Sequence, residues 1–106
     1  MPKMLIKASY TAEGAKGLIK EGGTGRRAAV QKLIEGVGGT MEAFYYAYGD
    51  ADAYLIVDVP NASDGLALSI AVNASGAVNL TTVPLITPEE MDAACKKSVN
   101  YRAPGA

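Results

Sequence analysis

Residues 40–59, TMEAFYYAYGDADAYLIVDV, decide how this chain folds. Residues 40–48 and 53–59 are rich in aromatic and β-branched side chains, which is typical of strands. The segment between them, GDAD at 49–52, has the composition of a tight turn, and Pro60 ends the second strand. Two strands joined by so short a turn form a β-hairpin in the middle of the chain.

The residues before this hairpin predict one strand and a broken helix. Residues 3–10 alternate as a strand, and Thr11 suits the N-cap of a helix that runs to about residue 21. The segment GGTG at 22–25 interrupts this helix, because glycine is unfavourable in helix interiors. A second helical segment, 26–35, has apolar side chains at helical spacing, namely Ala29, Val30, Leu33, Ile34 and Val37.

The residues after the hairpin repeat this order of helix and strand. Ser63 or Asp64 caps a helix over 65–73, and residues 78–86 form a strand in which Pro84 indicates an edge position or a strand end. The expected stripe of this helix is Leu66, Ser69, Ile70 and Asn73. Thr87 and Pro88 then begin a terminal helix that ends near Lys97.

The order β-α-β-β-α-β predicts an α+β fold of the ferredoxin-like type, in which one four-stranded antiparallel sheet has helices on one face. A chain of 106 residues is long enough for one such domain, which we place at residues 1–99 with a tail at 100–106. Neither face of the expected sheet is polar: Ile6 and Leu55 alternate with Leu5 and Ile56. We therefore expect a second copy of the chain to cover the face without helices, as a homodimer or a larger homo-oligomer. Incorrect phasing of these short strands would produce the same pattern.

The composition excludes several classes of function. The chain has no histidine, and Cys95 is its single cysteine, so the common zinc sites and the catalytic triads lack their residues. We expect no metal and no cofactor. The net charge of −1, without a basic patch, excludes nucleic acid as a partner, and no apolar run is long enough to span a membrane. One unpaired cysteine and no secretion signal favour the cytoplasm.

Five residues are candidates for a small-molecule site on the face that we expect a second copy to cover: Lys7, Tyr45, Tyr54, Asp58 and Thr81. A lysine beside a carboxylate in a buried interface can be a functional pair or a structural ion pair, and both readings stay open. Arg26 and Arg27, after the glycine-rich segment, are candidates for binding an anion or are solvated side chains. The catalytic residues stay unknown, and if the protein is an enzyme the acid-base candidates are Lys7, Asp58, Tyr45 and Tyr54.

The chain resembles the GYD-domain family over nearly its whole length. The similarity is carried by 10–14 (YTAEG), 38–39 (GG), the turn at Gly49, 76–78 (GAV) and 81–82 (TT). The stretch that names the family reads GDAD at 49–52, with Ala51 where the family has tyrosine. This resemblance implies the dimeric α/β-barrel form of the ferredoxin-like fold, and it implies no particular activity.

Three functions fit these features. The first is a binding or regulatory module whose sheet face holds a small organic or anionic ligand. The second is a cofactor-independent enzyme, similar to an oxygenase or isomerase, and the third is a purely structural oligomer. An open interface cavity with polar groups pointing inward would favour the first two, and a tightly filled apolar interface would favour the third.

Overall fold

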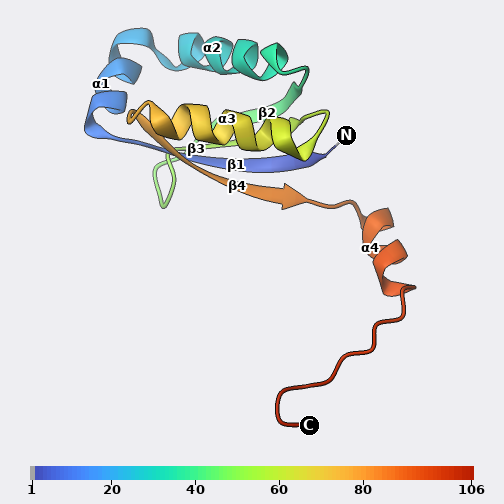
Figure 1. Ribbon diagram of the computed structural model, residues 1–106. Helices are drawn as coiled ribbons and strands as arrows, with labels where there is room; N and C mark the ends of the chain where they lie inside the picture. Colours follow the sequence, from blue (N-terminus) through green and yellow to red (C-terminus); the bar gives the residue numbers. More distant parts are fainter. Residues whose placement is uncertain (1) are drawn as a thin grey trace.

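The computed structural model describes residues 2–106 and has the predicted order of elements (Figure 1). In chain order these are β1 (Lys3–Tyr10), α1 (Ala12–Glu21), α2 (Gly23–Gly36), β2 (Thr40–Tyr46), β3 (Ala53–Asp58), α3 (Ala62–Ala74), β4 (Val78–Leu85) and α4 (Pro88–Cys95). The ends of β2, β3, β4 and α4 fall one or two residues before the predicted ends, where strands and helices commonly fray.

The four strands form one antiparallel sheet in the order β2-β3-β1-β4. This order confirms the predicted α+β fold of the ferredoxin-like type. Strand β1 lies in the middle and pairs with both β3 and β4, so that segments far apart in sequence are neighbours. Strand β4 lies at an edge of the sheet, which is where a strand containing Pro84 is tolerated.

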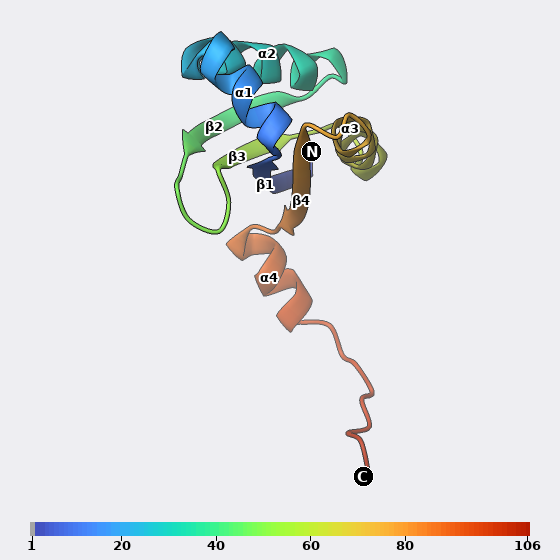
Figure 2. The same ribbon diagram turned by 90° about the vertical axis from the view of Figure 1, so that its left-hand side faces the viewer.

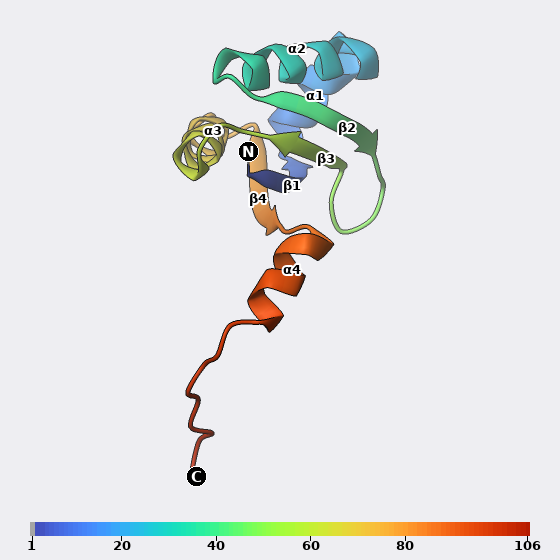
Figure 3. The same cartoon turned by 90° about the vertical axis from the view of Figure 1, so that its right-hand side faces the viewer.

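Helices α1, α2 and α3 lie on one face of the sheet, as Figures 2 and 3 show from two sides. Helix α2 packs against the edge strand β2, and α3 packs against the other edge strand, β4. The core between the two layers includes Ile34 of α2 and Leu68 of α3, together with the strand residues Met4, Ile6, Leu55 and Val57. Burial of these aliphatic side chains is the main source of the stability of the fold.

Helix α2 begins at Gly23, three residues before the predicted start. The expectation that the whole glycine-rich segment lies outside a helix is therefore wrong. Gly22 alone separates α1 from α2, with φ of 85°, a left-handed value that favours glycine. One residue in this conformation is enough to redirect the chain, so the glycines at 23 and 25 remain helical.

Helix α3 also differs from the prediction. It begins at Ala62 with Asn61 as N-cap, and the Asp64 carboxylate accepts the Asn61 backbone N–H at 3.0 Å. Leu66 and Ile70, expected on the packed stripe, are 62% and 60% exposed, whereas Leu68 is buried. The helix is turned about its axis relative to the prediction. The two polar members of the predicted stripe do contact the sheet, because Ser69 shares a hydrogen bond with Thr82 of β4 and Asn73 accepts the Leu80 N–H.

The chain from residue 86 onward leaves the body of the molecule as an extended arm (Figure 1). Helix α4 begins after Thr87, as its sequence predicts, and has a reciprocal capping box between Thr87 and Glu90, but it buries none of its residues. The arm explains why the radius of gyration is 16.9 Å, when a compact domain of this length has about 13 Å. Several apolar side chains of the arm are exposed, among them Met91, Val99 and Tyr101.

Candidate functional site

The face of the sheet opposite α1, α2 and α3 is the candidate site, and we call it the open face. Its side chains alternate along each strand with those that point into the core, such as Ile6 and Leu55. The open face carries Leu5, Lys7, Ser9, Ala43, Tyr45, Tyr54, Ile56, Asn79, Thr81, Val83 and Leu85, with Lys3, Glu42 and Asp58 at one end. The register and the alternating burial of the strands confirm that the alternating strand pattern was phased correctly.

Four of the five predicted ligand residues fall in one row across the open face. Lys7 of β1 is paired with Tyr54 of β3 on one side and with Thr81 of β4 on the other. Tyr54 is in turn paired with Tyr45 of β2. One ammonium, two phenols and one hydroxyl therefore lie side by side, and we call these four residues the polar row. Such a row can donate hydrogen bonds to an anionic or carbonyl oxygen and can stack on an aromatic ring.

A second row, entirely aliphatic, runs parallel to the polar row. It consists of Ala43, Ile56, Leu5 and Val83, one from each strand in the order of the sheet. Leu5 and Ile56 are only half-buried in the single chain, and Val83 is 38% exposed. An aliphatic row of this width, bordered by polar groups, has the composition of the centre of a protein interface.

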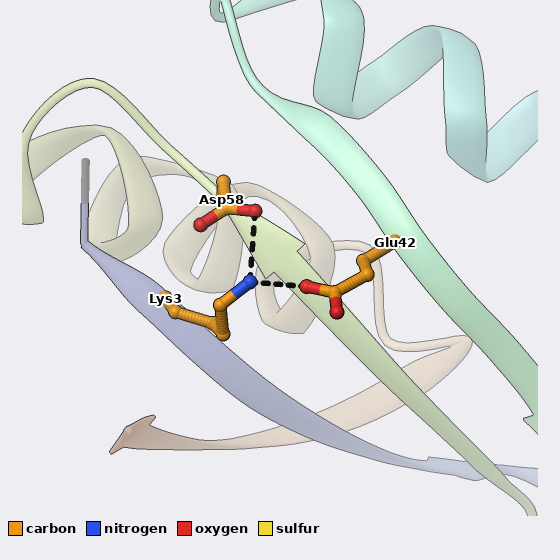
Figure 4. A network of polar contacts seen from close by, with 3 residues as sticks. All are labelled: Lys3, Glu42 and Asp58. Carbon is orange, nitrogen blue, oxygen red and sulfur yellow. Dashed lines mark hydrogen bonds and ion pairs between the residues drawn. The ribbon is translucent and has the colours of Figure 1, made fainter. Parts of the chain in front are cut away.

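Asp58, the fifth predicted residue, belongs to an ion-pair cluster at the end of the open face. Figure 4 shows the Lys3 ammonium between the carboxylates of Glu42 and Asp58. The Lys3 Nζ lies 3.1 Å from Oδ2 of Asp58. The hydrogen bond to Glu42, and then the one to Asp58, raises the pKa of Lys3. The cluster is partly exposed, so it contributes little to stability at moderate salt.

The structure does not bring Lys7 and Asp58 together, and the expectation of a Lys7–Asp58 pair is wrong. In the β1–β3 register Asp58 faces Lys3, four residues from Lys7 along the strand, which is a separation of about 13 Å. Sequence reasoning placed both residues on the correct face but did not fix the register. It also missed Lys3 and Glu42, and the second of these reaches the cluster from a register shift between Met41 and Ala43.

The two predicted anion-binding residues lie on the other side of the sheet, in the first turns of α2. Arg27 is exposed, whereas Arg26 is half-buried between the helices and the core. The side chains of the two arginines therefore differ in their surroundings. Cys95 is exposed at the end of α4. Among residues 2–106, no three Cys, Asp or Glu side chains come close enough together to hold a metal ion.

The turn at 49–52 is held against β1 by hydrogen bonds of Asp52. Its last residue, Asp52, accepts the Tyr10 backbone N–H at 2.8 Å through Oδ2, and its own N–H donates to the Ala8 carbonyl at 2.8 Å. Ala51, which stands where the family has tyrosine, is 3% exposed. These contacts attach the hairpin turn to the end of β1.

These observations define an α+β protein of the ferredoxin-like type with one bare sheet face. A family model described as the GYD domain matches residues 4–95, and the chain belongs to this family. The matched region includes β2, β3, β4 and α4 in full and all of β1 except Lys3. Comparison with curated proteins and with solved structures found no match. Within the described residues, no helix has the length and apolar character needed to cross a membrane.

Proposed function

We propose that this protein is a homodimeric binding module, in which two open faces pack together and enclose a small anionic organic ligand at the polar rows. The observation that carries the proposal is the open face itself, an aliphatic row and a polar row on which no helix of residues 2–106 is packed. Exposed apolar patches of this kind on small proteins mark interaction sites.

A second copy fits this face better than a small molecule alone. The four strands span a flat area of roughly 500 Å², from about 4.8 Å between strands and 3.3 Å per residue. A stable interface covers about 800 Å² on each partner. The arm supplies further apolar surface, since Met91 is 50% and Tyr101 is 74% exposed. The sheet face alone is smaller than this area, so we expect the arm to contribute to the interface as well.

The polar row is the reason why we propose a bound ligand in addition to a second copy of the chain. Packing two open faces together would remove Lys7 from water, and a buried ammonium needs an anionic partner. Asp58 is engaged by Lys3 and lies in another row, so it does not serve Lys7. An anionic oxygen on a small organic molecule would satisfy Lys7, and the phenols of Tyr45 and Tyr54 would contact its carbon skeleton.

The test is native mass spectrometry of the protein purified directly from its producing cells. We expect a dimer that carries additional mass, and we expect the additional mass to disappear in Lys7→Met while the dimer remains. Lys16→Met is the matched control, because Lys16 is exposed on α1 away from the open face. A monomer would contradict the proposal, and so would a dimer without additional mass in the unmodified protein.

A further inference from the structure

The second feature of this molecule that is built like a ligand site lies on the opposite side of the sheet, between the helices. Helices α2 and α3 pack on the two edge strands, which leaves the space above the central strands β1 and β3 incompletely filled. A cavity of about 50 Å³ is present there, and its lining is almost entirely apolar, including Ile6, Leu55, Leu68 and Leu80. A groove of about 410 Å³ between α1, α2 and α3 adjoins it.

Arg26 lies where the cavity and the groove meet. It lines both of them, as do Tyr10, Leu33, Val72 and Val78. Its Nε is fully buried and has no hydrogen-bond partner within residues 2–106. Buried guanidinium nitrogens are almost always paired, since an unsatisfied buried donor lowers stability. The groove also contains Glu13 and Glu21 of α1, but neither forms an ion pair with Arg26 in the described part of the chain.

We propose that this hollow binds a small carboxylic acid with an apolar body, whose carboxylate accepts hydrogen bonds from the Arg26 guanidinium and whose hydrocarbon chain lies in the groove with its end in the cavity. A planar guanidinium matches the two oxygens of a carboxylate, so a bound carboxylate would give the Arg26 Nε the partner that it lacks within residues 2–106. The apolar cavity excludes water and has room for the end of a hydrocarbon chain, and the larger groove has room for the rest of it. The phenol of Tyr10, which lines both spaces, is a further hydrogen-bonding group at the entrance.

This site does not depend on the proposed function at the open face. The sheet separates Arg26 from Lys7, and the cavity is formed by a single chain. Loss of one site therefore leaves the other in place, and the two can be tested separately.

Octanoate is the probe, and isothermal titration of the unmodified full-length protein is the measurement. We expect saturable binding of one octanoate per chain, much weaker binding of 1-octanol, which lacks the charge, and no binding of acetate, which lacks the apolar body. Arg26→Gln should weaken octanoate binding about tenfold or more, because it removes a charge-assisted pair. Arg27→Gln, at the exposed neighbour in the same helix, and Lys7→Met should leave it unchanged within about twofold.

A second measurement needs no substitution. With arginine labelled by ¹⁵N, the Nε–H signal of Arg26 should shift on addition of octanoate, whereas those of Arg27 and Arg102 should not. The proposal is overturned if octanoate does not bind, if it binds without moving the Arg26 signal, or if Arg27→Gln weakens binding as much as Arg26→Gln does.

Discussion

Gly14 in α1 has the tightest surroundings of the glycines in the described part of the chain. A Cβ at this position would lie 2.0 Å from the carbonyl oxygen of Ala77, a backbone atom that cannot move aside as a side chain could. The approach lets the N-terminus of α1 lie on the start of β4, where the Thr11 N–H donates to the same carbonyl at 3.0 Å. The absence of a side chain at Gly14 thus fixes how α1 sits on the sheet.

Gly14→Ala should lower the free energy of unfolding by about 2 kcal/mol, because overpacking exceeds the gain in helix propensity. Gly17→Ala in the same helix has no atom within 4 Å of the added Cβ, and should raise it by up to about 1 kcal/mol. Urea denaturation of both variants checks this contrast. Equal effects of the two substitutions would show that the contact with Ala77 does not constrain α1.

Tyr46 makes the free energy of unfolding fall as the pH becomes alkaline. Burial, and then the neighbouring Tyr10, raises the pKa of Tyr46 above its usual 10.0. The contribution of Tyr46 to the free energy of unfolding is fully present below pH 10, where the phenol is neutral in both the folded and the unfolded chain. It is lost as the pH rises through the pKa of the folded state. The raised pKa of Lys3 also makes stability fall with rising pH, in the range above pH 10.5.

Tyr46→Phe should therefore reduce the loss of stability above pH 10, measured by urea denaturation between pH 8 and 12. At neutral pH the same variant should lose at most about 1 kcal/mol, because the Tyr46 hydroxyl donates to the Gly23 carbonyl at 2.9 Å. Tyr48→Phe, whose ring is 103% exposed, serves as the control and should leave the profile unchanged. An unchanged profile in Tyr46→Phe would contradict this assignment.

At the scale of single residues, the sequence predicted which face of its strand each candidate occupies but not what lies beside it. The alternation of β1 and β3 placed Lys7, Tyr54 and Asp58 correctly on the open face. The register, which separates Lys7 from Asp58, depends on long-range pairing and cannot be read from local alternation. The cavity at Arg26 was likewise invisible, because it arises from the spacing of two helices on a sheet.

At the scale of elements, the start of α3 is stabilised by a capping box in which the Asp64 side chain takes part. The Asp64 carboxylate accepts the Asn61 N–H and supplies a negative charge in the first turn of the helix. Asp64→Ala should lower the free energy of unfolding by about 1 kcal/mol, and because α3 buries Leu68 the loss should appear in global unfolding. Ser63→Ala, at an exposed position one residue earlier, should be neutral. If Ser63→Ala costs more than Asp64→Ala, the helix begins elsewhere.

Element order was predictable and helix orientation was not, for a physical reason. Strands and helices here are bounded by strong local signals such as Thr11, Pro60 and Thr87. In α3, however, apolar side chains occur all round the helix, so periodicity alone does not identify the buried side. Contacts with β4 decide it, through Ser69 and Asn73, and they leave Leu66 and Ile70 exposed.

At the scale of the whole molecule, the chain has two kinds of exposed aliphatic surface that can be compared directly. Ile56 lies in the aliphatic row of the open face, and Ile70 is 60% exposed on the outer side of α3. Ile56→Lys should raise the dissociation constant of the dimer roughly a hundredfold or more, because it places an unpaired charge in the interface. Ile70→Lys should have no effect on it.

Sedimentation velocity of the two variants over a range of concentrations measures this difference. Circular dichroism spectra should remain the same as that of the unmodified protein, since neither side chain belongs to the core. Weaker association in Ile70→Lys than in Ile56→Lys would move the interface from the sheet to the helices.

The central claim is that a second copy of the chain covers the open face, and the mass of the unmodified protein in solution tests it most directly. Sedimentation equilibrium at micromolar concentration should give a particle of twice the chain mass of 10.9 kDa, or an even multiple of it. A single species of 10.9 kDa throughout this range would contradict the claim and leave the open face without its partner.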